Sequence, residues 1–318
     1  MKPPYQITPR ILQLVTSISE QIGAVNASHF YKPPTELRKK NRIQTIQSSL
    51  EIEGNTLTTE QITALINNKR VLAPQKDITE VKNAIEVYDN IQQFDPHSVD
   101  SFLEAHGQLM HGLVENPGRF RTRSVGIVRG SEVTHVAPPG EMVPPLMNQL
   151  FNYLADTEEI PLIKSCVFHY EMEFIHPFVD GNGRMGRLWQ TLLLQQTYPL
   201  FEYLPIEHLI KEQQQAYYQA LSHSDNIGES TPFIEFMLQI IHEALHELLA
   251  TPVTPLNNID RLELFKGIIA HQPFSRKEYM EHFKTISPAT ASRDLKYGVD
   301  HQILEKSGEK RNTTYRYK

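Results

Sequence analysis

Two helical patterns flank a glycine-rich segment near the middle of this 318-residue chain. Apolar and aromatic residues recur at steps of three and four in PLIKSCVFHYEMEFI (161–175), and a second helical pattern follows in GRMGRLWQTLLLQQ (183–196). Similar patterns occur at 41–54, where a glycine follows the last turn, and at 232–249. The sequence therefore favours a mainly α fold, with residues 176–187 forming a loop that leads into a helix.

The composition is that of an ordinary globular protein, 40% hydrophobic and 21% charged. Cys166 is the single cysteine, so the chain can form no internal disulfide. No apolar run reaches the ~18 residues that a membrane helix needs. The first ten residues also lack the apolar stretch of a secretory signal. We therefore expect a cytoplasmic protein with no membrane contact.

One segment departs from the helical pattern. β-branched residues are frequent in RSVGIVRGSEVTHVAPP (123–139), which has Gly-Ser at its centre and Pro-Pro at its end. This combination is typical of two short strands joined by a tight turn. We therefore expect one small β-hairpin or flap within the otherwise helical part of the chain.

A linker is predicted at TPVTPLNN (251–258), which combines two prolines with little hydrophobicity. Before the linker we expect an N-terminal helical region (1–95) that contains the 41–54 helix, followed by a core region (96–250). After it we expect a separate C-terminal domain (259–318). The chain is long enough for each of these parts to bury a hydrophobic core.

The C-terminal domain has the pattern of three helices and a hairpin. Amphipathic helices are predicted at 261–272 and 275–283, and a third at 287–304 begins with a Ser-Pro pair suited to a helix start. The tail, 304–318, reads as two strands joined by a polar turn, which completes a winged-helix order. Residues 257–318 contain 12 Lys and Arg against 8 Asp and Glu, so they carry +4 and the rest of the chain −10. This asymmetry indicates an anionic partner for the C-terminal domain.

The segment HPFVDGNGRMGR (176–187) can be interpreted in more than one way. Its GNGRMG string (181–186) matches the G-x-G-x-x-G pattern of dinucleotide-binding folds, but that pattern needs a preceding strand and a βαβ unit, which the sequence does not contain. A Walker loop is excluded because the G-x-x-x-x-G-K-[ST] pattern is absent. A plain solvent-exposed glycine loop is the simplest alternative.

The residue types in this segment favour an anion-binding loop. Gly181 and Gly183 allow successive backbone N–H groups to turn toward one point, where a helix starting near Gly183 adds the positive end of its dipole. Arg184 and Arg187 are three residues apart on that helix, so both side chains can reach the same anion. A polyphosphate fits these groups.

Two further residues of the segment can supply reactive chemistry. Asp180 can hold Mg²⁺, which keeps several waters and needs few carboxylates. His176 is the residue of the segment that can accept a proton near neutral pH. The segment can thus bind a polyphosphate with Mg²⁺ and deprotonate a nucleophile beside it.

The segment resembles the motif of the Fic family, H-x-F-x-[DE]-G-N-G-R-x-x-R, at every defined position. The resemblance implies a Fic-type helical bundle whose core is the 96–250 region, with a small β-hairpin flap and a C-terminal winged-helix domain. It also implies transfer of AMP from ATP to a Ser, Thr or Tyr hydroxyl of a target protein. The implied roles are His176 as general base, Asp180 as Mg²⁺ ligand, Gly181, Asn182 and Gly183 as phosphate nest, Arg184 for the β-phosphate, Arg187 for the γ-phosphate, and Phe178 as a core anchor.

The resemblance extends to two other segments. PGRFRTRSVGI and HVAPP are similar to the family's flap, which implies that Val133, Thr134, His135 and Val136 pair with an extended target segment. AYYQAL (216–221) is similar to the segment that lines the adenine pocket, which makes Tyr217 the candidate there. For Tyr217, a core tyrosine is an equally good interpretation.

A second stretch, SSLEIEGN (48–55), resembles the family's inhibitory helix, [ST]-x-x-x-E-[GN], with Ser49, Glu53 and Gly54 in place. A carboxylate in the last turn of a helix is unfavourable by about 0.3–1 kcal/mol unless a cation compensates it, and a solvated glutamate is the plain alternative. The resemblance implies that Glu53 pairs with Arg187 and takes the cation that the γ-phosphate needs. We therefore expect an autoinhibited enzyme.

Three functional hypotheses remain open from the sequence. The first is the autoinhibited adenylyltransferase; the second adds removal of AMP by the same site; the third is a DNA-binding regulator with a nucleotide-sensing Fic domain. The C-terminal domain resembles winged-helix DNA-binding modules, although a protein partner fits the same fold. The candidate DNA contacts are Thr290, Ser292, Arg293 and Lys296 on the third helix and Lys306, Lys310 and Arg311 on the wing. The target protein and the ability to form a homodimer are left open.

Overall fold

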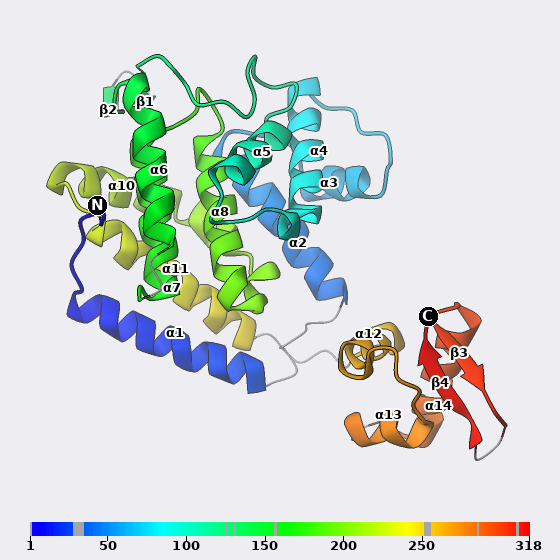
Figure 1. The fold of residues 1–318 in the computed structure, drawn as a ribbon. Coiled ribbons are helices and arrows are strands. Elements are labelled where there is room, and N and C mark those ends of the chain that lie inside the picture. The colour runs from blue at the N-terminus through cyan, green and yellow to red at the C-terminus, as the bar shows by residue number, and fades with distance from the viewer. Residues whose placement is uncertain are drawn as a thin grey trace. The chain divides into compact units, whose positions relative to one another are not determined.

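The structure is a computed structural model that describes residues 2–27, 35–124, 126–129, 132–155, 158–250, 256–284, 286–309 and 312–318. These residues form mostly helices, with one two-stranded sheet in the middle of the chain and another at its C-terminal end (Figure 1). The predicted fold class, a mainly α fold with a small hairpin, is confirmed. None of the helices in the described ranges is long and apolar enough to cross a membrane.

The chain divides into two compact units, which are described separately. The first comprises Met1–Ser28 and Lys40–Thr251, and the second comprises His29–Lys39 and Pro252–Lys318. Apart from residues 29–39, the region before residue 95 thus falls in one compact unit with the predicted core. Most of the predicted linker, residues 251–255, lies outside the described residues.

The first unit is built from helices and one hairpin. Its helices are α1 (Pro9–Ala27), α2 (Thr35–Ile52), whose first residues are grouped with the second unit, α3 (Thr59–Ile66), α4 (Gln75–Asp89), α5 (Val99–Leu109), α6 (Val143–Leu154), α7 (Pro161–Ile175), α8 (Asn182–Thr197), α9 (Ile206–Glu212), α10 (Gln214–Ile227) and α11 (Thr231–Ala250), with 3₁₀ turns at Ile91–Gln93, Gly140–Met142 and Pro199–Glu202. The predicted helices at 161–175, 183–196 and 232–249 match α7, α8 and α11 within one residue at each end. The helix predicted at 41–54 begins earlier, at Thr35, and ends at Ile52.

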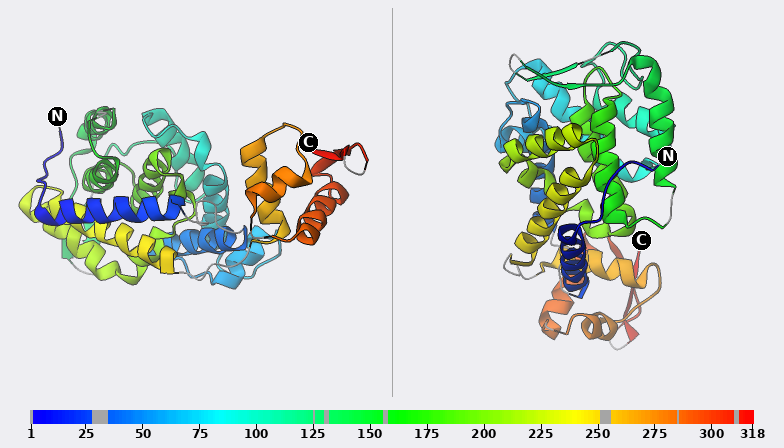
Figure 2. Two further views of the ribbon diagram at one scale, coloured as in Figure 1. Left: turned by 90° about the horizontal axis from the view of Figure 1, so that it is seen from below. Right: turned by 90° about the vertical axis from the view of Figure 1, so that its left-hand side faces the viewer.

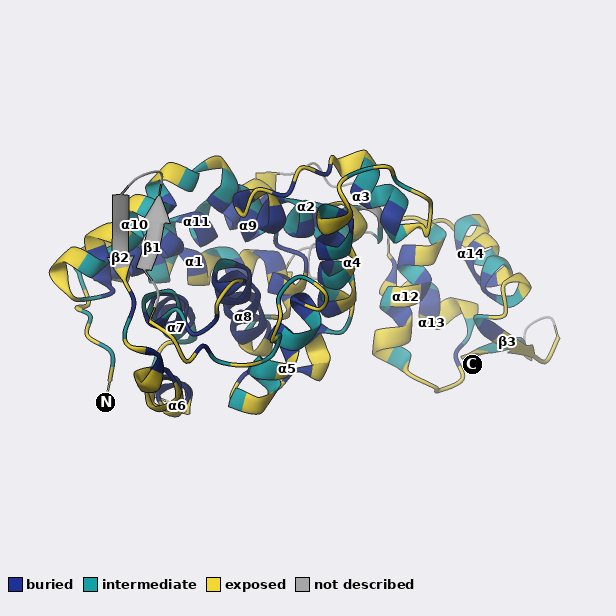
Figure 3. Cartoon of the chain, turned by 90° about the horizontal axis from the view of Figure 1, so that it is seen from above, coloured by how far each residue is buried: buried dark blue, intermediate teal, exposed yellow. Residues whose placement is uncertain are grey.

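Helix α8 forms the centre of the first unit. Nearly every residue from Asn182 to Gln195 is buried (Figure 3). A helix enclosed on all sides has to be apolar all round or has to pair its polar side chains with neighbouring groups. Helix α7 packs along α8, and α1 packs along α11 (Figure 2). The loop between α7 and α8 is therefore carried by the most deeply buried helix of the molecule's first unit.

An aromatic cluster fills the core directly behind this loop. Phe102 on α5 has no exposed surface, and its ring centroid lies 4.9 Å from that of Trp189, 5.5 Å from that of Phe151 and 5.4 Å from that of Phe178. Phe178 belongs to the loop itself and is fully buried, as the sequence predicted. Aromatic contacts at these separations stabilise a core beyond the area that they bury. The cluster thus fixes the base of the loop to α5, α6 and α8.

The predicted hairpin is present as β1 (Gly126–Arg129) and β2 (Glu132–Val136). The strands are antiparallel, with Gly126 opposite Val136 and Arg129 opposite Glu132, and the register shifts after Ile127. Such a shift is a bulge, which increases the twist of a two-stranded ribbon.

The second unit contains three helices and a hairpin in the predicted order. They are α12 (Asn258–Ile269), α13 (Arg276–His282), α14 (Pro288–Asp300), β3 (Leu304–Ser307) and β4 (Thr314–Tyr317). Helix α14 ends four residues earlier than predicted, because Gln302 takes a left-handed φ of 60° and the N–H of Ile303 then caps the carbonyl of Gly298 at 2.8 Å. Strands β3 and β4 pair antiparallel, with Leu304 opposite Tyr317. Their inward residues join the helices in one apolar core.

The aromatic cluster yields a stability prediction. Replacing Phe102 with alanine removes the ring that touches α6, α8 and the loop, so the free energy of unfolding of the first unit should fall by about 3–5 kcal/mol. Urea unfolding followed by the fluorescence of Trp189, the single tryptophan, measures the change directly. Leu12→Ala is the matched control, because Leu12 is 55% exposed on α1 and should change stability by less than about 1 kcal/mol. Equal losses in the two variants would contradict the prediction.

Candidate active site

The loop between α7 and α8 joins two helices through two left-handed residues. His176 caps the C-terminus of α7 with a φ of 50°, and Gly181 precedes α8 with a φ of 90°. The left-handed conformation is costly for a histidine and suits a glycine, so neighbouring groups have to hold His176 in it. The side chain of His176 is half-buried at the mouth of this loop.

Arg121 supplies the restraint on His176. Its buried guanidinium donates to the carbonyl oxygens of His176 (2.7 Å), Ile175 (3.0 Å), Pro138 (2.7 Å) and Arg123 (2.7 Å). Burial lowers the pKa of Arg121, but an arginine stays protonated in proteins. This cation therefore ties the end of α7 to the segments on both sides of the hairpin and fixes the backbone that carries His176.

The remainder of the loop is braced by Asn182 and His106. The Asn182 amide both accepts from the N–H of Phe178 (2.9 Å) and donates to its carbonyl (3.0 Å). Burial lowers the pKa of His106 to about 4, so its ring is neutral near pH 7. Because Nδ1 accepts from the N–H of Gly118, Nε2 carries the proton and donates to the carbonyl of Asp180 at 3.0 Å. Hydrogen bonds from these two side chains thus hold the backbone of the loop at Phe178 and at Asp180.

Arg187 is the most deeply buried cation of the site. Its Nε donates to Oγ of Ser49 (3.1 Å), and its Nη2 donates to the carbonyl of Ser49 (2.8 Å) and to Oε1 of Glu53 (2.8 Å). Burial is the largest single influence and acts to lower the pKa of Arg187, but the charges of Glu53 and Tyr217 and the hydrogen bond to Glu53 together outweigh it, so the net direction is upward. The predicted Glu53–Arg187 pair is present in the structure. Glu53 lies one residue beyond the end of α2, and Gly54 then turns the chain with a φ of 91°.

The carboxylate of Glu53 lies against the start of α8. A Cβ atom added to Gly183 would collide with Oε1 of Glu53 and would lie 3.1 Å from Nη1 of Arg187. In the part of the chain that the structure describes, this Nη1 has no hydrogen-bond partner. A helix N-terminus, a glycine without a side chain and an open arginine donor make a site for an anion, and the Glu53 carboxylate lies in it.

Arg184, one turn earlier on α8, is held by two carboxylates. Its Nη2 donates to Oδ1 of Asp180 at 2.7 Å, and its Nη1 pairs with Oε1 of Glu80 on α4. The Nε of Arg184 has no partner among the described residues. Both arginines of the motif therefore lie beside the loop with one N–H group still able to bind an anion.

Asp180 meets the requirements of a magnesium ligand that works together with phosphate. Its side chain is 49% exposed at the edge of the loop, beside Arg184. Within the described ranges, no three His, Cys, Asp or Glu side chains are grouped to hold a metal ion. Mg²⁺ is commonly held by one or two carboxylates plus phosphate oxygens and water, so the single carboxylate of Asp180 fits that arrangement.

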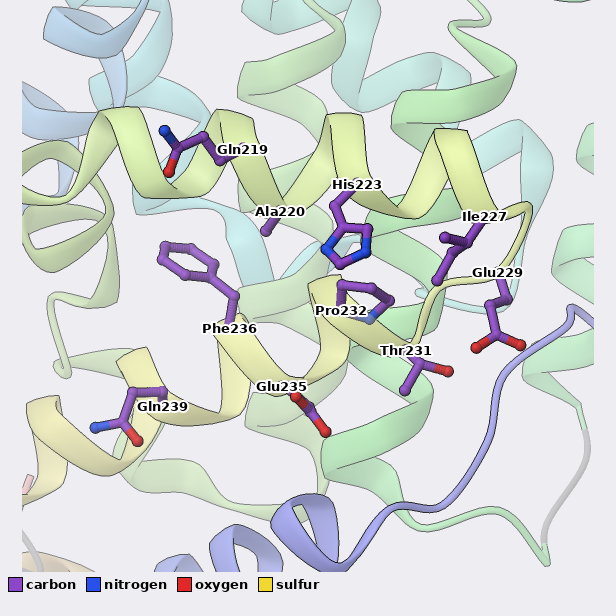
Figure 4. A pocket seen from close by; sticks show the side chains of 10 residues that line it. All are labelled: Gln219, Ala220, His223, Ile227, Glu229, Thr231, Pro232, Glu235, Phe236 and Gln239. Atoms are coloured by element: carbon purple, nitrogen blue, oxygen red, sulfur yellow. The ribbon is translucent and has the colours of Figure 1, made fainter.

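Tyr217 lies in the core in this conformation. It is 1% exposed, and its hydroxyl lies 3.0 Å from Nε2 of His169, whose Nδ1 contacts Gln190 at 2.7 Å. This is the placement of a core tyrosine, which was one of the two interpretations of Tyr217 from the sequence. Contact of Tyr217 with adenine stays a prediction. A separate hollow of about 480 Å³ is lined by residues of α10 and α11. Figure 4 shows His223 of α10 lying over Pro232 of α11 in this hollow. The hollow shares no residue with the His176–Arg187 loop.

The predicted docking residues of the hairpin lie on β2. Val133, Thr134 and His135 belong to the strand, but their side chains are outside the described residues. Val136 is 75% exposed at the end of the strand. Pairing of this strand with a target stays a prediction.

The predicted DNA contacts of the second unit are partly described. On α14, Ser292 is half-buried, while Arg293 and Lys296 are exposed one turn apart. The backbone N–H of Thr290 donates to Oγ of Ser287 at 3.1 Å, and the hydroxyl oxygens of these two residues lie 3.0 Å apart. Lys306 is exposed on β3. Lys310 and Arg311 lie outside the described residues.

Three residues that organise the site were not predicted from the sequence: Glu80, His106 and Arg121. Glu80 had a detectable signal, because it falls on the apolar stripe of its helix, four residues before Ala84 and seven before Val87. A charged residue in such a stripe has to find a buried partner. His106 and Arg121 contact backbone carbonyls, which leave no trace in the pattern of side chains.

Comparison with solved structures finds a full-length match. The crystal structure of a Fic family protein from Desulfovibrio desulfuricans G20 is 41% identical, with a TM-score of 0.76, over 100% of this chain and 98% of that chain. A structure of Fic-1 (residues 134–508) from Caenorhabditis elegans has a TM-score of 0.61 at 20% identity and covers 76% of this chain and 72% of that chain, so it supports the fold alone.

Comparison of sequences leads to the same family. The Fic/DOC family model matches residues 96–194. Protein adenylyltransferase Fic of Nematostella vectensis is 28% identical over 80% of this chain and 61% of its own length. The same-named protein of Drosophila grimshawi is 30% identical over 73% of this chain and 48% of its own length. This chain thus spans about half to three fifths of these relatives, and the full-length match to the bacterial structure shows that it belongs to the Fic family.

Proposed function

We propose that this chain is a protein adenylyltransferase that transfers AMP from ATP to a Ser, Thr or Tyr hydroxyl of a target protein. The observation that carries the proposal is the pair of buried arginines at the start of α8, each with an N–H group that has no partner in the described part of the chain. These donors lie beside a rigid loop that carries His176. Relatives named protein adenylyltransferase support the reaction class.

The reaction assigned to His176 is the removal of a proton from the target hydroxyl. The hydroxyl oxygen then forms a bond to the α-phosphorus of ATP, the bond from that phosphorus to the bridging oxygen breaks, and pyrophosphate leaves. A histidine is suited to this role because its ring can accept a proton near neutral pH. Arg121 keeps the ring in place by holding the carbonyl of the same residue.

Charge that develops on the phosphates is stabilised by groups already fixed in the fold. Arg184 and Arg187 donate from one face of α8, and the backbone N–H groups at the start of that helix add the positive end of its dipole. Mg²⁺ held by Asp180 would neutralise further phosphate charge when bound. Since the loop is braced by Asn182 and His106, little reorganisation is needed at the moment of transfer.

In this proposal Glu53 is the brake. Its carboxylate lies at the helix start and on Arg187, where a terminal phosphate would have to bind. Both anions seek the same donors, so ATP either binds weakly or places its α-phosphate badly for in-line attack. The Glu53 side chain is 28% exposed, so it can move into water more readily than a buried carboxylate when a phosphate takes its place on the buried Arg187.

Removal of the brake should raise transfer of AMP to protein. Glu53→Gly frees Arg187 from a charge-assisted hydrogen bond worth about 1.5–3 kcal/mol, which corresponds to a rise of about tenfold or more. The measurement is labelling of protein by α-³²P-ATP with Mg²⁺ in a bacterial lysate. Adding His176→Ala to the Glu53→Gly variant should lower labelling by about a hundredfold or more, because the base is lost.

The matched control is Glu51→Gly, which places a glycine at the same end of α2. Glu51 pairs with Lys211 on α9 and does not reach Arg187, so labelling should stay at the resting level. Equal labelling in the Glu53→Gly and Glu51→Gly variants would contradict the brake. Release of AMP from a labelled target, dependent on Glu53, would add AMP removal to the activity of the site.

For the second unit we propose a winged-helix domain that contacts DNA through α14. Arg293 and Lys296 lie one turn apart on its exposed face. Arg276 of α13 donates to Oγ of Ser292 at 2.8 Å, which brings a third cation to the same face. Basic side chains grouped on one helix are the usual means of binding phosphate backbones.

This proposal predicts weaker and less salt-dependent DNA binding when the cations are removed. Arg293→Ala and Lys296→Ala should each reduce the slope of log Kd against log salt by about 1, because each removes one phosphate contact. Fluorescence anisotropy with a mixed-sequence duplex measures the slope. The control is Lys277→Ala on α13, where Lys277 is 84% exposed and pairs with Glu281. If the wild-type chain binds no duplex at low salt, the DNA proposal is wrong.

A further inference from the structure

Arg184 has two carboxylate partners that differ sharply in their surroundings. The side chain of Glu80 is 5% exposed, as is that of Arg184, whereas the side chain of Asp180 is 49% exposed. Removing the partner of a buried carboxylate strongly destabilises the folded state, whereas an exposed carboxylate can rotate into water at little cost. Glu80 is therefore the permanent partner of Arg184, and Asp180 is the exchangeable one.

The second oxygen of Glu80 is also engaged. Its Oε2 accepts from Nδ2 of Asn55 at 2.7 Å, and the same Nδ2 lies 3.2 Å from the carbonyl of Asp77. The next residue, Thr56, donates from its backbone N–H and its hydroxyl to Oδ2 of Asp77. The chain that follows the inhibitory turn is thus fastened to the first two turns of α4.

Asn55 lies two residues beyond Glu53, and its backbone N–H closes the same turn by donating to the carbonyl of Leu50 at 3.1 Å. Glu80 consequently contacts both parts of the proposed machinery. One oxygen holds the arginine assigned to the β-phosphate, and the other holds the turn that presents the brake.

We propose that Glu80 is a positioning residue that holds Arg184 in the phosphate site and, through Asn55, anchors the turn that carries Glu53. This inference rests on the proposed function, because it assigns Arg184 to phosphate binding. Arg184 keeps its Nε–H for the phosphate while Glu80 fixes its Nη1. Without Glu80, Asp180 would be its sole carboxylate partner, and the guanidinium would be drawn toward the exposed edge of the loop.

The test is calorimetric binding of ATP with Mg²⁺ in the Glu53→Gly background, where the brake is absent. The further substitution Glu80→Gln keeps the shape of the side chain and one of its two acceptor oxygens, but it removes the negative charge that fixes Arg184. Binding should weaken by about tenfold, the loss of one well-placed charge-assisted contact. Glu86→Gln, an exposed residue of the same helix, is the matched control and should leave affinity unchanged.

A second comparison separates positioning from general damage to the fold. Glu80→Asp in the same background retains the charge on a shorter side chain, so it should restore part of the lost affinity, which a merely structural role would not require. Asn55→Ala in the otherwise wild-type chain should tighten ATP binding, because the Glu53 turn loses its anchor, and it should have no effect once Glu53 is glycine. Asn67→Ala, exposed after α3, is the control.

The outcomes distinguish the inference from the proposed function. If Glu53→Gly binds ATP and Glu80→Gln in that background binds it equally well, Glu80 does not position Arg184 and the inference is overturned alone. Should Glu53→Gly itself bind no ATP, the proposed function fails and the inference falls with it. If Glu80→Gln does not fold, the Glu80→Asp and Asn55→Ala results decide the question.

Discussion

Two arginine side chains buried at the start of one helix determine how the rest of the first unit is arranged. Arg184 and Arg187 are 4% and 1% exposed, and a guanidinium cannot escape burial by releasing its proton. Anions therefore have to reach them, and the chain supplies these from elements far away in sequence. Glu53 comes from the end of α2 and Glu80 from α4, so both helices have to pack beside α8.

The sequence revealed the loop because its chemistry is local. The spacing of Arg184 and Arg187 and the glycines before them need no knowledge of the remaining fold, and the helices on either side follow from periodicity alone. Glu53 was found through its resemblance to a known motif. Glu80 was missed because its partner is 104 residues away, and Arg121 because carbonyl acceptors carry no sequence signal. The end of α14 was also misplaced, because the left-handed φ of 60° at Gln302, an unfavourable conformation for that residue, cannot be read from the helical pattern.

Two of the missed residues, His106 and Arg121, share a role, because both hold the backbone of the loop in place by hydrogen bonds. His176 is held in a left-handed conformation that costs on the order of 1–3 kcal/mol. Arg121 offsets this cost with hydrogen bonds to four carbonyls, and His106 fixes the next turn. In the proposed function, a base and a phosphate loop that the fold holds in place need little reorganisation during the reaction.

In the proposed function, a carboxylate and a phosphate compete for the same donors, so the fold has to distinguish anions that should leave from anions that should stay. Exposure provides that distinction: Glu53 is 28% exposed at its side chain and Glu80 is 5% exposed. When Glu53 moves into water, a phosphate takes its place on Arg187, so the charge of the buried guanidinium remains compensated. Moving Glu80 would leave Arg184 with a single partner at the surface. The two glutamates are therefore chemically alike but suited to opposite tasks, one displaceable by substrate and the other permanent.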